Sequence, residues 1–159
     1  MDVGNILRPE SVHCELGARS KKHALELLSE ALAETSEAYS AEEILDGLIH
    51  RERLGCTGLG RSVAMPHTRV SGLKESVGAF LRLDEAVDFD SIDDEPVDLI
   101  FGLLVPDDCD DDQIREVREL IETLGDSVLQ QKLRDAEAPA QLYNLLTESL
   151  TIIHKTLRA

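Results

Sequence analysis

The chain has 159 residues, a length that fits one domain built around a single hydrophobic core. Its 32 Asp and Glu residues outnumber its 16 Lys and Arg residues, so the formal net charge is −16. A surface this acidic repels nucleic acid and anionic lipid, so we expect neither as a partner. A basic partner protein or a cation is compatible with such a surface.

No apolar run approaches the roughly 20 residues that cross a bilayer, so we expect no membrane insertion. The amino end, residues 1–5, lacks the basic and apolar regions of a secretory signal. The cysteines are odd in number, far apart and without a CxxC pair: Cys14, Cys56 and Cys109. This pattern indicates reduced thiols in a cytoplasmic protein rather than a disulfide framework or a zinc knuckle.

Two amphipathic helices are predicted first along the chain. Residues 20–35 carry apolar side chains on one helical face. Ser40 and Glu43 form a capping-box pattern that opens a second helix, which should end near residues 54–55. A glycine-containing loop is expected after this helix.

The middle of the chain predicts two strands, and helices follow them. Residues 77–83 are mostly apolar, and residues 97–105 are almost continuously apolar, as in a strand buried on both faces. Helical spacing resumes in residues 114–124, a further helix is expected from a cap at Asp126, and another follows Pro139. Helices at both ends of the chain around a central sheet predict a layered α/β domain.

A short cationic window interrupts the acidic chain. From Arg51 to Arg69, four arginines stand against one glutamate, which gives a local charge of +3. Glycines let backbone N–H groups approach an anion closely, and arginine offers a planar fork of donors to phosphate oxygens. The window also holds three glycines and a hydroxyl donor: Gly55, Thr57, Gly58 and Gly60. Such a segment is suited to hold a transferable phosphoryl group.

His67 follows Pro66 near the end of this window. A neutral imidazole is nucleophilic near pH 7, and the proline stiffens the backbone before it. Phosphoryl transfer needs mainly positioning and charge stabilisation, so no metal or other cofactor is expected if the donor is itself a phosphohistidine. A histidine after a proline is also a common turn residue or capping donor, and the glycines lack the terminal Lys-Ser/Thr of a nucleotide phosphate loop. The window alone therefore leaves the role of His67 open.

Five segments follow one another at a characteristic spacing. They are RERLGCTGLG at 51–60, VAMPH at 63–67, FDSID at 89–93, PVDL at 96–99 and LLVP at 103–106. Together they resemble the signature of the fructose/mannitol-type enzyme IIA domains of the bacterial phosphotransferase system, and most of all its nitrogen-regulatory IIA proteins. The resemblance extends from about residue 6 to about residue 147. It implies a single domain of this type over residues 1–159, with a C-terminal tail at 148–159.

The resemblance implies a phosphocarrier with a mixed central sheet flanked by helices. His67 matches the family's phosphoryl acceptor, which receives the group from a small HPr-like protein, and Arg51 matches the arginine that holds it. Independently of the resemblance, the residue types of the cationic window lead us to expect that Thr57, Gly58 and Gly60 form the phosphate loop. The phosphorylation state would regulate target proteins related to nitrogen or carbon. Two alternatives stay open: a regulatory binding module with weak or no phosphoryl transfer, and a separate-chain IIA component of a sugar transporter.

The chain departs from the family pattern at Gln113, where a second histidine is usual at the start of the next helix. A glutamine amide can donate a hydrogen bond to a phosphoryl oxygen, but it cannot become cationic. The amino end of the helix still contributes partial positive charge to this wall of the site. We therefore expect phosphoryl acceptance to persist, and either onward transfer to be slower or the lifetime of the phosphorylated state to change.

A second departure is the aspartate run at residues 107–112, which places five carboxylates directly before Gln113. The simpler interpretation is a solvated loop in which Asp112 caps the following helix. A calcium site is the alternative, although the run lacks the glycine turn and distal glutamate of an EF-hand loop.

Overall fold

The computed structural model describes residues 6–35, 38–108 and 110–158, with side chains as far as residue 149. The expectations for residues 1–5 and for Cys109 lie outside the described residues.

The described residues form strands and helices in the following chain order. The strands are β1 (Leu7–Leu16), β2 (Gly58–Gly60), β3 (Val63–Ala64), β4 (His67–Val70), β5 (Val77–Val87) and β6 (Val97–Pro106). The helices are α2 (Lys21–Glu34), α3 (Ala41–Leu54), α4 (Asp111–Leu124), α5 (Ser127–Asp135) and α6 (Pro139–Arg158).

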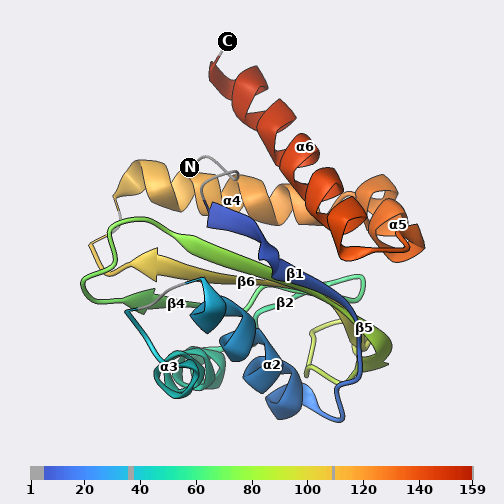
Figure 1. Ribbon diagram of the computed structural model, residues 1–159, viewed down its shortest axis with the longest axis horizontal. Helices are drawn as coiled ribbons and strands as arrows, with labels where there is room; N and C mark the ends of the chain where they lie inside the picture. Colours follow the sequence, from blue (N-terminus) through green and yellow to red (C-terminus); the bar gives the residue numbers. More distant parts are fainter. Residues whose placement is uncertain (1–5, 36–37, 109, 159) are drawn as a thin grey trace.

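All six strands belong to one mixed sheet in the order β1-β5-β6-β3-β2, and β4 also pairs with β6. Strands β3 and β4 run parallel to β6, whereas β5 runs antiparallel to it. Helices α2 and α3 cover one face of the sheet, and α4 to α6 lie on the other (Figure 1). The predicted α/β class, with a mixed sheet between helices, is confirmed.

Strand β6 separates two hydrophobic clusters. Its alternate side chains Leu99, Phe101 and Leu103 pack with α4 to α6, while Ile100 and Leu104 pack with α2 and α3. This alternation confirms the prediction of a strand buried on both faces. At Gly102 an added Cβ would lie 2.5 Å from a methyl carbon of Leu28, so only glycine lets α2 approach the sheet this closely.

The predicted helices are confirmed, with caps close to those expected. Ser20, Ser40 and Asp126 are the N-cap residues of α2, α3 and α5. Helix α6 continues to Arg158, so residues 148–158 of the segment expected to be a tail continue a helix.

Four strands were not predicted. Strand β1 contains Pro9 and exposed polar residues, and its pairing with β5 shows register shifts, so its sequence lacks clean alternation. As an edge strand it tolerates a proline. The expected glycine-containing loop instead contains β2, β3 and β4, of three, two and four residues. These strands are too short to show a period, and they form because β6 and each other offer pairing partners.

Candidate functional site

His67 is the first residue of β4, where it pairs with Leu103 of the buried strand β6. The backbone just before it is fixed by a 3.0 Å hydrogen bond from the N–H of Leu103 to the carbonyl of Pro66. Its ring nitrogen Nδ1 lies 2.9 Å from the carbonyl oxygen of Met65. Because a carbonyl can only accept, Nδ1 carries the proton and Nε2 carries the free lone pair of the neutral ring.

The pKa of His67 lies below the ordinary histidine value. Burial of the ring is the largest cause, and the positive charge of Arg51 acts in the same direction. The hydrogen bond to Met65 and the negative charge of Glu52 oppose this shift without reversing it. The imidazole is therefore neutral near pH 7, the state in which Nε2 is a nucleophile.

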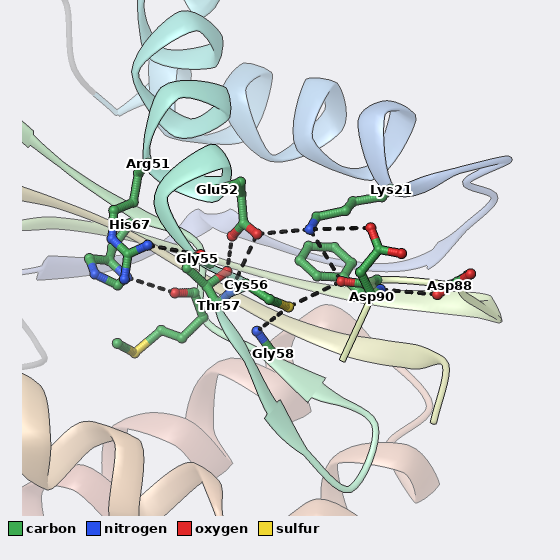
Figure 2. Close-up of polar contacts among 12 residues, drawn as sticks. Lys21, Arg51, Glu52, Gly55, Cys56, Thr57, Gly58, His67, Asp88 and Asp90 are labelled. Carbon is green, nitrogen blue, oxygen red and sulfur yellow. Dashed lines mark hydrogen bonds and ion pairs between the residues drawn. The ribbon is translucent and has the colours of Figure 1, made fainter. Parts of the chain in front are cut away.

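Arg51 lies in the last turn of α3, where a cation is favoured by the helix dipole. Its Nη1 donates a 2.9 Å hydrogen bond to the carbonyl of Gly55, the C-cap residue of the same helix. Figure 2 shows its guanidinium beside the ring of His67. The structure thus brings together the two residues that the sequence nominated as acceptor and phosphoryl clamp.

Thr57 is buried, and both of its donors are directed to one carboxylate. Its hydroxyl and its backbone N–H donate to Glu52, the latter at 3.3 Å (Figure 2). The expectation that the Thr57 hydroxyl serves an incoming anion does not match this arrangement. The hydroxyl already donates its hydrogen bond to the buried carboxylate of Glu52.

Gly58 and Gly60 lie in the β2–β3 hairpin. The N–H of Gly58 donates to the sulfur of Cys56 at 3.2 Å, and an added Cβ there would overlap the Ser91 hydroxyl at 2.4 Å. Gly60 adopts a positive φ of 85° at the turn, next to the carboxylate of Asp93. These two glycines permit the hairpin and its close contact with the segment at residues 88–96, and the Gly58 N–H is directed to Cys56 and not to His67.

Gln113 is the third residue of α4, and Asp110 is its N-cap. The Asp110 carboxylate accepts from the N–H of Gln113, and the Gln113 amide oxygen accepts from the N–H of Asp110, both at 2.9 Å. The cap is thus Asp110 and not Asp112, because only Asp110 stands three residues before a glutamine that completes a capping box.

Strand alternation places His67 on the side of the sheet that α4 covers. Thr68 lies against Gly47 of α3, so its neighbour His67 points to the opposite face. Strand β6 ends at Pro106, three residues beyond the partner of His67, and α4 starts soon afterwards. The amino end of α4, with Gln113, therefore lies toward the same end and face of the sheet as His67.

Two charged residues near the site were not identified from the sequence as functional. Glu52, the single acid of the cationic window, has a side chain only 6% exposed, and it forms a 2.9 Å ion pair with Lys21 of α2. The one signal was the isolation of Glu52 among arginines; nothing in the sequence pointed to Lys21.

Neither a metal cluster nor a membrane span is found in the described part of the chain. No group of three or more His, Cys, Asp and Glu side chains within residues 6–35, 38–108 and 110–149 is arranged to hold a metal ion. No helix of the described residues is long and apolar enough to cross a membrane.

Comparison with known proteins identifies the family of this chain. A family model described as "Phosphoenolpyruvate-dependent sugar phosphotransferase system, EIIA 2" matches residues 5–149. The chain belongs to this family. A nitrogen regulatory protein of Pseudomonas aeruginosa is 35% identical over 143 residues, which cover 90% of this chain and 93% of that protein. One of Klebsiella oxytoca is 33% identical over 150 residues, covering 94% and 92%.

A solved structure also resembles this chain, and it too is a nitrogen regulatory protein. The crystal structure of nitrogen regulatory protein IIA-Ntr from Neisseria meningitidis superposes with a TM-score of 0.84 at 34% identity. The superposition covers 91% of this chain and 99% of that one. The protein is therefore an EIIA 2 protein of the nitrogen-regulatory IIA subgroup, with a phosphocarrier and regulatory role in a phosphotransferase system.

Proposed function

We propose that this protein accepts a phosphoryl group on Nε2 of His67 from an HPr-like carrier in the cytoplasm. Its phosphorylation state then regulates target proteins related to nitrogen or carbon use. The observation that carries the proposal is the ring geometry of His67, whose Nδ1 is bound to the Met65 carbonyl. The lone pair is therefore confined to Nε2, with the Arg51 guanidinium beside the ring (Figure 2).

The bonds and charges of the phosphoryl transfer can be accounted for without a metal ion. The Nε2 lone pair attacks the phosphorus of the donor's phosphohistidine in line, and the donor's P–N bond breaks with its electron pair returning to the donor ring. Nδ1 of His67 keeps its proton, so the phosphorylated ring carries a positive charge that the Met65 carbonyl stabilises. Arg51 supplies a permanent cation for the phosphoryl oxygens, and the reverse sequence passes the group on.

The direct test is a mass measurement on the intact protein. The chain is incubated with phosphoenolpyruvate, enzyme I and the HPr-type carrier of the same organism, and then analysed at neutral to alkaline pH. We expect the wild type and His50→Gln, which changes an exposed histidine of α3, to gain one phosphoryl group. His67→Ala should gain none. Phosphorylation of His67→Ala, or none of the wild type, would contradict the proposal.

A regulatory binding module with weak transfer is the second candidate, and Gln113 favours it. Its side-chain oxygen is committed to the cap of α4, and its amide cannot carry a positive charge. In the same assay this function predicts a wild type that gains little or no phosphoryl group but still binds its targets.

A further inference from the structure

Lys21 occupies a position that helix stability does not explain. It is the first residue of α2, directly after the N-cap Ser20, and the first turn of this helix holds no acid. A cation at this end opposes the helix dipole. Its side chain is nevertheless only 21% exposed and lies with Nζ 4.7 Å above the ring of Phe89, donating to the Phe89 carbonyl at 3.2 Å. Other contacts must therefore account for this placement.

The decisive contact of Lys21 is with Glu52. Nζ lies 2.9 Å from Oε2 of Glu52, whose side chain is 6% exposed. The same carboxylate accepts from the hydroxyl and the N–H of Thr57. A buried carboxylate is strongly unfavourable unless a cation and hydrogen-bond donors compensate it, and Lys21 and Thr57 provide both. The pair thereby joins α2, the end of α3 and the segment that enters β2 (Figure 2).

A continuous set of contacts leads from this pair to the proposed nucleophile. The carbonyl of Thr57, the residue that Glu52 holds, accepts the N–H of Met65 at 3.0 Å. The carbonyl of Met65 in turn accepts the Nδ1 proton of His67 at 2.9 Å. On the other side of Glu52, the carbonyl of Gly55 accepts the Arg51 guanidinium. The short segment from Gly55 to Thr57 therefore supports both proposed reacting side chains.

The Lys21–Glu52 pair also affects the electrostatic potential at His67. The negative charge of Glu52 acts on His67, so an uncompensated Glu52 would repel a dianionic phosphoryl group. Lys21, with Nζ 2.9 Å from this carboxylate, offsets part of the charge, while Arg51 hydrogen-bonds the Gly55 carbonyl.

We propose that the Lys21–Glu52 ion pair is a positioning device for phosphoryl transfer. It anchors Thr57 and, through the Met65 peptide, holds the His67 ring with Nδ1 protonated and Nε2 free. This inference rests on the proposed function of His67. Lys21 and Glu52 are positioning residues that do not touch the phosphoryl group themselves.

The test compares ring state and transfer rate in the full chain. Nitrogen NMR of the unphosphorylated protein reports which ring nitrogen of His67 carries the proton. Lys21→Met and Thr57→Val should give a mixture of the two neutral forms and lower the maximal transfer rate by about tenfold, with the carrier KM unchanged. Lys21→Arg, which keeps the charge, should restore most of the rate.

The chain offers a matched control in a second ion pair. Arg134 and Asp98 form two contacts of 3.1 and 3.0 Å, and their side chains are 29% and 23% exposed. Arg134→Met should lower the melting temperature, as Lys21→Met does, but leave the His67 spectrum and the transfer rate unchanged.

The outcomes separate this inference from the function on which it rests. Failure of the wild type to become phosphorylated overturns the proposed function, whereas the NMR measurement needs no phosphoryl donor. Folded Lys21→Met and Thr57→Val proteins with wild-type His67 spectra and wild-type rates overturn the positioning role. If Lys21→Met does not fold, Thr57→Val decides, since it removes only one hydroxyl from a nearly isosteric side chain.

Discussion

The His67 ring is bound to the backbone of a residue two positions before it: Nδ1 lies 2.9 Å from the carbonyl oxygen of Met65. The contact spans Pro66, whose fixed φ restricts the path of the chain between the two groups. Met65 itself is buried, and the surrounding residues restrict the movement of its backbone. The protonated nitrogen is therefore held by the fold, and the other nitrogen is left for chemistry.

We expect His67 to titrate below the ordinary histidine value of 6.5, because burial of its ring and the nearby Arg51 disfavour the protonated form. The phosphoryl-acceptance rate should remain high as the pH falls to 6.5 and decline only at the lower pKa, where Nε2 gains a proton. The C2 proton resonance of His67, followed by NMR against pH, measures this pKa. A midpoint at or above that of the chain unfolded in denaturant would contradict the expectation.

Replacement of Arg51 by glutamine should slow phosphoryl acceptance by about a hundredfold, because one fixed cationic donor to the transferred group is removed. It should also raise the pKa of His67, since the charge of Arg51 lowers it. Single-turnover rates and the NMR titration measure the two effects. Arg53→Gln, an exposed arginine of the same helical turn, is the control and should change neither. Equal rates for both variants would exclude Arg51 as the clamp.

Gln113→His should speed onward phosphoryl transfer, because a histidine at this position can become cationic opposite the phosphoryl group. It also removes the side-chain oxygen that accepts from Asp110, so unfolding should become easier by about 0.5–1 kcal/mol. Gln113→Glu is the matched comparison: it retains the capping pattern, adds a negative charge and should slow transfer. Stopped-flow transfer rates and urea unfolding test both variants. A Gln113→His variant that transfers more slowly would contradict the placement of residue 113 opposite the phosphoryl group.

Gly102→Ala should destabilise the protein by about 1–3 kcal/mol, the usual range for overpacking. The new methyl group would lie 2.5 Å from Leu28, whose side chain is fully buried and has little room to move. Gly17→Ala is the control, since an added Cβ there meets nothing within 4 Å. Urea unfolding measures both, and similar midpoints for the two variants would show that α2 shifts to accommodate the methyl group.

Local signals in the sequence were sufficient to predict the helices and β6, apart from the cap of α4 and the length of α6. The caps at Ser40 and Asp126 act through hydrogen bonds within three residues, so their residue types predict them directly. Strand β6 is identifiable because burial on both faces demands a continuous apolar run. Strand β1 and the short strands β2 to β4 depend on partners distant in the sequence, which periodicity does not reveal.

The candidate site divides in the same way. His67 and Arg51 share one window of sequence, and the structure places their side chains together. The Lys21–Glu52 pair joins two helices, and no spacing rule connects a lysine at the start of one to a glutamate near the end of the other. The contact of the Thr57 hydroxyl with Glu52 could not be predicted, because the burial of these two side chains against each other is a property of the folded chain. From the sequence alone, the hydroxyl was expected to serve an incoming anion.

The pairing of β4 with β6 has a consequence for how a phosphorylated form would be recognised. His67 to Val70 are in register with Leu103 to Pro106, and β6 is anchored between two hydrophobic clusters. A phosphoryl group on such a strand adds negative charge at a position whose backbone is held in the sheet. We therefore expect both forms to have nearly the same shape, so that a target protein distinguishes them by electrostatic potential at this one spot. Phosphorylation would then be recognised through a change of local charge and not through a change of conformation.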